Sequence, residues 1–240
     1  MKRESCIQIY LSIYRNENDM DIITIHGLKK YYGDGNHQVK ALDGIDLSIR
    51  QGEFTAIVGA SSSGKTTLLN MMGGLDVPDA GEVILDGVNL ADLREEQLAL
   101  FRRKKTGFIF QNYNLIPTLT VEENILFPLD LDGSAPDQKF LDEITDLLGL
   151  QDKLNAWPEM LSGGEQQRVA IARALAVKPP VILADEPTGS LDSKNGQNVA
   201  GLLKMTAELY HRTLVMITHN IELAQLADRV IRMKDGRIED

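Results

Sequence analysis

The stretch "GASSSGKTT" at 59–67 limits the possible folds of this 240-residue chain more than any other feature. It matches the pattern G-x-x-x-x-G-K-[ST], follows the apolar run "FTAIVG" and precedes a helix that we expect over Lys65–Met72. In that context glycines let backbone N–H groups curl around phosphate oxygens, and the helix N-terminus adds the positive end of its dipole. The sequence therefore predicts a phosphate-binding loop between a buried strand and a helix.

The rest of the chain is typical of a layered α/β fold. "DIITIHGL" and "LDGIDLSIR" alternate between apolar and polar residues, as strands do in an antiparallel sheet with one solvent-exposed face. "PVILADE" and "RTLVMITH" are continuous apolar runs between helices, which favours a parallel sheet. We expect a P-loop NTPase core with a mainly parallel sheet, an antiparallel β subdomain, and a helical subdomain over about residues 91–165.

The N-terminal segment lacks the apolar pattern needed to pack, so residues 1–19 are expected to form a tail before a domain over 20–240. Both Met1 and Met20 remain candidates for the native start. A single cysteine, Cys6, excludes an intrachain disulfide. The net charge of −10 disfavours an overall affinity for nucleic acid. The chain has no apolar stretch of the ~18 residues that a membrane-spanning helix needs.

The phosphate loop supplies the first group of candidate site residues. We expect Lys65 to reach the outer phosphates and take part in catalysis, and the Thr66 hydroxyl to bind Mg2+. The expected phosphate contacts are Gly59, Ala60, Ser61, Ser62, Ser63, Gly64, Lys65, Thr66 and Thr67.

Polar residues at the ends of other expected strands supply the second group. Asp185 and Glu186 end "VILADE", and we expect Asp185 to bind Mg2+ and Glu186 to act as the general base that activates water. His219 ends "RTLVMITH" and could contact the γ-phosphate. Gln111 follows the short strand "TGFIF", where its carbonyl could ligate Mg2+ and its amide could orient water.

"LSGGEQQRVAIARAL" over 161–175 contains a further candidate site. Ser162 and Glu165 have the spacing of a capping box, which predicts a helix start. The capping box does not explain Gly163 and Gly164, which have no side chains and would leave the backbone N–H groups at the helix start accessible. These features predict a second anion site, which is useful only if phosphates can be reached from two sides.

This stretch resembles the signature motif of ATP-binding cassette (ABC) ATPases, and the phosphate loop, Gln111, "VILADEP", "SLD" and His219 follow in that family's order. The resemblance implies a head-to-tail, ATP-dependent homodimer in which Ser162, Gly163, Gly164 and Glu165 of one copy meet ATP held by the other. It also implies that Asp192 links the two sites. Tyr32 matches the aromatic residue that stacks on adenine, with Tyr31 as the alternative.

One position departs from the family pattern, because Ser62 stands where glycine is common. If that position needs a positive φ, serine is strained there by roughly 1 kcal/mol.

The segments "GGLDVPDAGEV" and "LADEPTGSLDS" are similar to those of macrolide exporters, lipoprotein-releasing systems and bacitracin-type peptide-resistance transporters. That similarity implies an ATP-hydrolysing subunit that works with a separate integral membrane permease. The chain would then be cytoplasmic and peripheral at the inner face of the membrane. The alternative is a soluble, non-transport ABC ATPase acting on nucleic acid or ribosomes, which the net charge of −10 disfavours. The cargo, its direction and the identity of the permease stay open.

Overall fold

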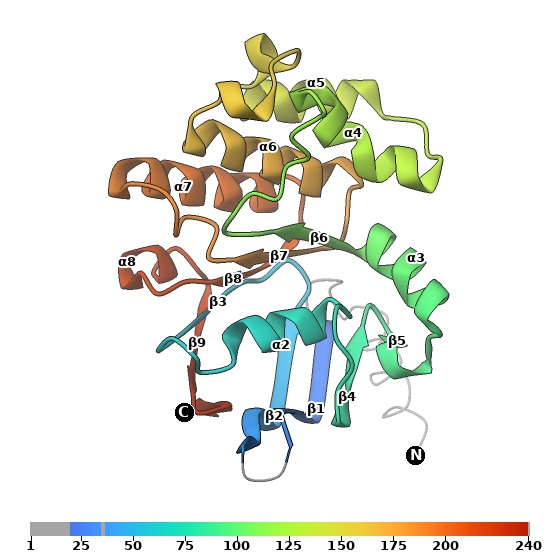
Figure 1. Cartoon of the computed structure of the whole chain (residues 1–240), viewed down its shortest axis with the longest axis vertical. Coiled ribbons are helices and arrows are strands. Elements are labelled where there is room, and N and C mark those ends of the chain that lie inside the picture. Colours follow the sequence, from blue (N-terminus) through green and yellow to red (C-terminus); the bar gives the residue numbers. More distant parts are fainter. Residues whose placement is uncertain (1–19, 35–36, 240) are drawn as a thin grey trace, which may run out of the picture.

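The computed structural model describes residues 20–34 and 37–239 (Figure 1). The tail expected over residues 1–19 lies outside the described residues. The strands are β1 (Asp21–Tyr32), β2 (Val39–Arg50), β3 (Phe54–Gly59), β4 (Ala80–Leu85), β5 (Val88–Asn89), β6 (Thr106–Ile109), β7 (Val181–Asp185), β8 (Thr213–Ile217), β9 (Arg229–Lys234) and β10 (Arg237–Glu239). The α-helices are α2 (Lys65–Met72), α3 (Glu95–Lys105), α4 (Val121–Asp132), α5 (Gln138–Leu147), α6 (Gly163–Ala176), α7 (Ser193–Leu209) and α8 (Ile221–Ala224).

Two sheets organise these elements, as the sequence predicts. One has four strands in the order β2-β1-β4-β5, and all of its pairs are antiparallel. The other has six strands in the order β10-β9-β3-β8-β7-β6, and its pairs are parallel except for β10 with β9. The predicted fold, a mainly parallel core with an antiparallel β subdomain, is therefore confirmed.

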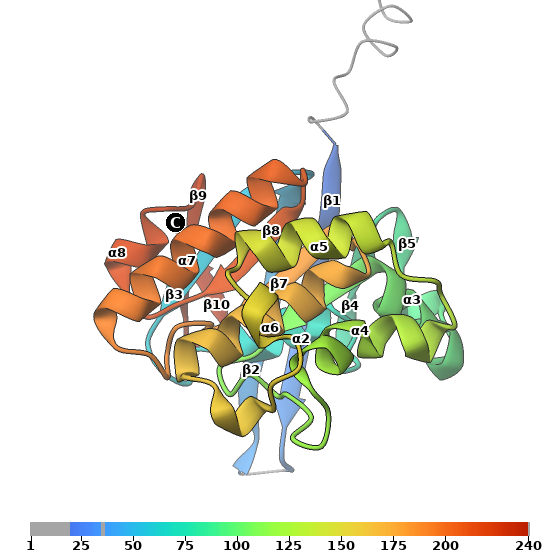
Figure 2. The ribbon, with the colours of Figure 1, turned by 90° about the horizontal axis from the view of Figure 1, so that it is seen from above.

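The six-stranded sheet is buried on both faces, which explains its continuous apolar strands. In β7, Val181 and Leu183 pack in one apolar cluster with α2 and the antiparallel sheet. Ile182 and Ala184, which alternate with them, pack in a second cluster with α4, α5, α6 and α7. Figure 1 shows the resulting layers, with α2 on one side of the sheet and α6 and α7 on the other. Figure 2 shows the same helices from above, with α6 between α7 and α4.

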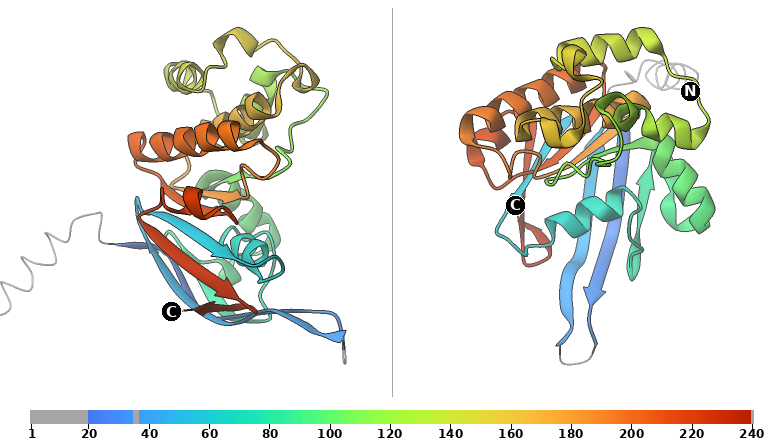
Figure 3. Two further views of the ribbon diagram at one scale, coloured as in Figure 1. Left: turned by 90° about the vertical axis from the view of Figure 1, so that its left-hand side faces the viewer. Right: turned by 45° about the horizontal axis from the view of Figure 1, so that its top comes forward.

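The region expected to be helical, over about residues 91–165, contains α3, α4 and α5. It also contains β6, which pairs with β7 and so belongs to the six-stranded sheet. Phe140 and Ile144 of α5 and its C-cap Leu148 are buried, so one face of this helix is packed. The side view in Figure 3 shows α4 and α5 in the layer farthest from the antiparallel sheet. The boundaries of a helical subdomain remain a prediction.

The topology brings four strand ends together. The strands β3, β8, β7 and β6 are neighbours and parallel, so their carboxyl ends lie along one edge of the sheet. The phosphate loop follows β3, His219 follows β8, Glu186 follows β7 and Gln111 follows β6. Ligands of parallel α/β sheets bind at this edge.

Candidate nucleotide-binding site

The phosphate loop joins β3 to α2 and has two positions at which only glycine fits. Gly64 is the N-cap of α2 with a φ of 97°, and a Cβ there would clash with the carbonyl oxygen of Ala41. A Cβ on Gly59 would clash with the carbonyl oxygen of Met233 in β9. Close backbone approach therefore explains both glycines of the motif.

Lys65 holds a positive charge inside this loop. Its side chain is buried, and its Nζ donates hydrogen bonds to the carbonyl oxygens of Gly59 at 3.0 Å and Ala60 at 2.7 Å. An ammonium group that is surrounded by backbone and shielded from water attracts a phosphate more strongly than an exposed one. The loop is thus an anion-binding site by charge as well as by backbone geometry.

Ser62 has a φ of 67°, in the left-handed region. This is the positive φ at which serine was expected to be strained. A side chain in this region costs roughly 1 kcal/mol relative to glycine. The strain is therefore present in this loop.

We expect Ser62→Gly to raise the free energy of unfolding by up to about 1 kcal/mol and to leave ATP affinity equal or tighter. Ser61→Gly is the matched control, because Ser61 lies outside the positive-φ region and a glycine there only adds freedom to the unfolded chain. Urea denaturation and ATP titration measure the two effects. A clear loss of ATP affinity in Ser62→Gly would show that the Ser62 side chain itself makes a needed contact.

Asp185 and Thr66 face each other across the sheet edge. The Thr66 hydroxyl donates to Oδ1 of Asp185 at 3.3 Å. Burial raises the pKa of the Asp185 carboxyl, the neighbouring charge of Glu186 raises it further, and the hydrogen bond from Thr66 opposes the change. A half-buried carboxylate beside a second one is an environment that a cation would stabilise.

Glu186 and His219 form a second pair at this edge. His219 Nδ1 lies 3.2 Å from Oε2 of Glu186. Glu186 has a φ of 45°, and its backbone N–H donates to the carbonyl oxygen of Ile217 at 3.1 Å. Strained backbone of this kind often clusters at functional sites. The structure thus brings together the predicted base and the predicted histidine.

Gln111 reaches the same region from β6. Ser190 Oγ donates to the Gln111 carbonyl oxygen at 3.2 Å. A Cβ on Gly189 would lie only 2.8 Å from Nε2 of Gln111, so the amide side chain rests on the turn that follows Glu186. The turn is closed by a hydrogen bond from Gly189 N to the Glu186 carbonyl oxygen at 2.9 Å.

The two tyrosines considered for adenine stacking differ in their surroundings. Tyr31 donates its hydroxyl to Asp43 at 2.7 Å and is half-buried. Tyr32 is exposed, and its hydroxyl donates to Asp76 at 2.7 Å. Burial and the contact with Asp76 raise the pKa of Tyr32, whereas the adjacent hydroxyl of Thr67 lowers it. Tyr32 is therefore the tyrosine that lies beside the phosphate-loop helix.

The signature residues lie at the start of α6, as the sequence predicts. Ser162 is the N-cap, and its Oγ accepts from Glu165 N at 3.4 Å. In return, Ser162 N donates to Oε2 of Glu165 at 2.8 Å. The hydrogen bonds from Ser162 lower the pKa of Glu165. The predicted capping box is confirmed, and it engages the Glu165 carboxylate in the helix start.

The helices that follow the two expected anion sites pack on opposite faces of the six-stranded sheet. α2 packs on one face and α6 on the other (Figure 1). Asp192, the expected link between sites, is the exposed N-cap of α7 and accepts from Asn195 N at 3.0 Å. The hydrogen bonds from Asn195 lower the pKa of Asp192.

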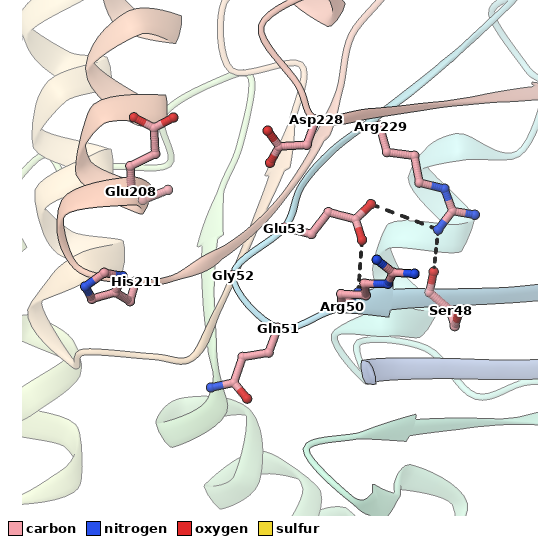
Figure 4. Close-up of a pocket in the computed structure, with 10 residues that line it drawn as sticks. Ser48, Arg50, Gln51, Gly52, Glu53, Glu208, His211, Asp228 and Arg229 are labelled. Carbon is pink, nitrogen blue, oxygen red and sulfur yellow. Dashed lines mark hydrogen bonds and ion pairs between the residues drawn. The ribbon is translucent and has the colours of Figure 1, made fainter. Parts of the chain in front are cut away.

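A polar hollow of about 880 Å3 lies at the other end of β3 (Figure 4). Two of its charged residues are engaged within the chain. Asp228 accepts from Phe54 N at 2.9 Å, and Arg229 donates to the Ser48 carbonyl oxygen at 2.8 Å. Because it lies at the amino end of β3, this hollow is separate from the candidate site.

No sequence pattern indicated the contacts made by three residues near the site, which are Asp76, Tyr113 and Arg173. Asp76 holds both Tyr32 and Lys30, and Arg173 donates to the backbone of the loop after Gln111, where Tyr113 lies. Asp76 lies within "GGLDVPDAGEV" and Arg173 within "LSGGEQQRVAIARAL", but the sequence suggested no contact for either side chain. No local pattern marks such contacts, because they join segments that are far apart along the chain.

The chain matches known proteins over most of its length. A family model described as ABC transporter matches residues 42–189. An uncharacterized ABC transporter ATP-binding protein of Methanocaldococcus jannaschii is 44% identical over 225 residues, which cover 91% of this chain and 95% of that protein. The macrolide export ATP-binding/permease protein MacB of Nitrosomonas europaea is 47% identical over 221 residues, covering 90% of this chain. The chain spans only 33% of that macrolide export protein.

Solved structures show the same fold. The dimeric, post-hydrolysis structure of the M. jannaschii cassette, bound to ADP and Pi, has a TM-score of 0.82 and 43% identity and covers 91% of this chain and 97% of that chain. The cbiO1 protein from Clostridium perfringens, part of the ABC transporter complex cbiONQ, has a TM-score of 0.81 and 29% identity. The match covers 92% of this chain and 87% of the cbiO1 chain. Among the described residues, no helix is both long enough and apolar enough to cross a bilayer.

The family model, the relatives and the shared fold agree with the geometry of the strand ends. The chain therefore belongs to the ABC transporter family, as an ATP-binding subunit with the ABC ATPase fold and ATP hydrolase activity.

Proposed function

We propose that this chain hydrolyses ATP at a composite site shared by two copies, and thereby drives a separate membrane permease. The observation that carries the proposal is the meeting of four side chains at adjacent strand ends. Lys65, His219, Glu186 and Gln111 follow β3, β8, β7 and β6, which are consecutive in the sheet. The similarity to macrolide export proteins supports a role in export. Handling of antimicrobial peptides or lipoproteins is the other role that the sequence resemblance implies.

Each of the four groups has a chemical role in this proposal. Lys65 and the loop N–H groups, over 59–67, hold the phosphates, and Glu186 takes the proton of the attacking water. His219 orients the Glu186 carboxylate, from which its ring nitrogen lies 3.2 Å away, and reaches the γ-phosphate. The Gln111 amide orients the water. Tyr32, exposed beside the loop helix, stacks on adenine.

The proposed cofactor is Mg2+, held by Thr66, Asp185 and Gln111. These residues offer a hydroxyl, a carboxylate and an amide carbonyl, which make the all-oxygen donor set that Mg2+ prefers. The Thr66 hydroxyl and the half-buried Asp185 carboxyl already lie 3.3 Å apart, and Lys65 is near enough for its charge to act on Asp185 without forming an ion pair with it. When bound there, the ion would neutralise charge on the phosphates.

The proposed partner in the site is a second copy of the chain, arranged head to tail. The helix that begins with Ser162–Gly164 packs on the opposite face of the sheet from the helix that follows the phosphate loop, and the two starts have different neighbours. In this proposal one copy therefore does not bring its own Ser162–Gly164 to its own loop. In a head-to-tail pair, Ser162, Gly163 and Gly164, with Glu165 capping the helix, grip the outer phosphate of the partner's ATP. Asp192 lies between the two sites. The dimeric structure of the M. jannaschii relative supports the pairing of two copies.

The proposed surface for the permease is a hollow of about 330 Å3 beside the loop that follows Gln111. Its lining is mainly apolar and includes Phe108, Phe110, Ile116, Phe127 and Val177. An apolar hollow of this kind suits a short helix with an apolar face from the partner. Binding there would place the chain at the inner face of the membrane, and no nucleic acid partner is expected of a chain with net charge −10.

Pull-down of the tagged chain from detergent-solubilised membranes tests the transporter role. We expect a multi-span permease to co-purify, and Phe127→Arg to abolish its recovery because a charge would enter the hollow. Leu131→Arg is the matched control, since Leu131 is exposed on the same helix and does not line the hollow. Recovery of nucleic acid or ribosomes in place of a permease would favour the non-transport alternative.

A further inference from the structure

Arg173, in the second half of α6, holds the loop that follows Gln111. Its Nη1 donates to the Asn114 carbonyl oxygen at 2.5 Å, and its Nη2 donates to the Tyr113 carbonyl oxygen at 2.7 Å. The guanidinium is thus forked over two successive carbonyls, and the residue is half-buried. Because the fork is planar and rigid, this pairing sets the direction of the loop as well as its distance from α6.

The two carbonyls belong to residues that need such support. Tyr113 has a φ of 61° and Asn114 a φ of 49°, both in the left-handed region. Consecutive non-glycine residues in this conformation are strained, and they persist only where the surroundings hold them. The hydrogen bonds from Arg173 stabilise this conformation, so their loss would let the loop relax to other conformations.

Tyr113 also contacts the other end of the same helix. A Cβ on Gly163 would lie 2.8 Å from the hydroxyl oxygen of Tyr113, so the tip of the ring lies over the first glycine of α6. The backbone of Tyr113 is held by Arg173 and its side chain lies on Gly163. The loop after Gln111 is therefore seated along the helix that carries the expected second anion site.

We infer that Arg173 is a positioning residue for Gln111, because it fixes the loop over 112–114 on α6 and so sets where the Gln111 amide lies. The inference rests on the role proposed above for Gln111. The backbone carbonyl oxygen of Gln111 accepts a hydrogen bond from Ser190 Oγ at 3.2 Å, on the side of the Glu186 turn. Gln111 is thus placed by two anchors, one on the Glu186 turn and one on α6, and a shift of α6 would move it.

Arg173→Gln should lower kcat about tenfold, the effect expected from losing hydrogen bonds to a charged donor. The KM for ATP should stay nearly unchanged, because the phosphate loop over 59–67 remains intact. The Mg2+ concentration that gives half the maximal rate should rise, because Gln111 supplies one proposed ligand. Arg173→Lys keeps the charge and can reach one carbonyl, so it should restore part of the rate.

A double-mutant cycle separates positioning from a general structural role. In a Gln111→Ala background, Arg173→Gln should cause no further loss of kcat and no further shift in Mg2+ dependence. Arg102→Gln is the matched control, since Arg102 Nη1 donates to the Gly74 carbonyl oxygen at 2.8 Å, away from the loop. Any effect of Arg102→Gln on kcat should persist unchanged in the Gln111→Ala background.

Two results overturn the inference, and they differ in what else they overturn. If Gln111→Ala impairs hydrolysis but Arg173→Gln lowers kcat by the same factor in both backgrounds, Arg173 does not act through Gln111. If Gln111→Ala alone changes neither kcat nor Mg2+ dependence, the role proposed for Gln111 fails and the inference fails with it. Thermal melting is measured for each variant to check that it is folded. If Arg173→Gln does not fold, Arg173→Lys replaces it in the same double-mutant cycle.

Discussion

Glu186→Gln should slow ATP hydrolysis by about 10²–10⁴-fold while ATP binding survives. Glutamine keeps the shape and the hydrogen-bonding capacity of glutamate, including the 3.2 Å contact with His219, but it cannot accept a proton from water. Lys65 and Thr66 still hold the phosphates, so affinity is retained. Single-turnover hydrolysis and equilibrium ATP titration measure the two quantities on the same preparation.

The matched control for this change is Glu222→Gln, because Glu222 is an exposed glutamate of α8 whose contact is with Gln197, at 3.4 Å. Its hydrolysis rate should stay at the wild-type value. A Glu186→Gln chain that hydrolyses ATP normally would show that Glu186 is not the base.

Lys65→Ala should abolish measurable hydrolysis and also weaken ATP binding, by about 10–100-fold if one charge-assisted contact is lost. The buried Lys65 ammonium is the positive charge held inside the phosphate loop, and alanine leaves the outer phosphates without it. Lys204→Ala, on the distant helix α7, is the control and should leave both quantities unchanged. Wild-type turnover in Lys65→Ala would contradict the assignment of the phosphate loop.

The strands and the phosphate loop could be predicted from the sequence because their signals are local. The apolar run "FTAIVG" coincides with β3, and the expected helix over Lys65–Met72 has the bounds of α2. The capping box at Ser162 and Glu165 marked the start of α6 in the same way. In each case the signal lies within the few residues that make the structure.

Contacts between distant segments could not be predicted. Tyr32 meets Asp76 across 44 positions, and Arg173 meets Tyr113 across 60. These pairs depend on how α2 and α6 pack on the sheet, and no spacing in the sequence encodes that. The sequence proposed Gly163 as a phosphate contact but gave no sign that Tyr113 lies over it.

The composite site is tested most directly by the mass of the Glu186→Gln chain in solution. Size-exclusion chromatography with light scattering should show a shift from 26.6 kDa toward twice that mass with ATP, but none with ADP, which lacks the phosphate that Ser162–Gly164 would grip. Adding Ser162→Arg should remove the shift by blocking that contact. A Glu186→Gln chain that is saturated with ATP and yet stays at the mass of one copy, both alone and with the permease present, would contradict the composite site.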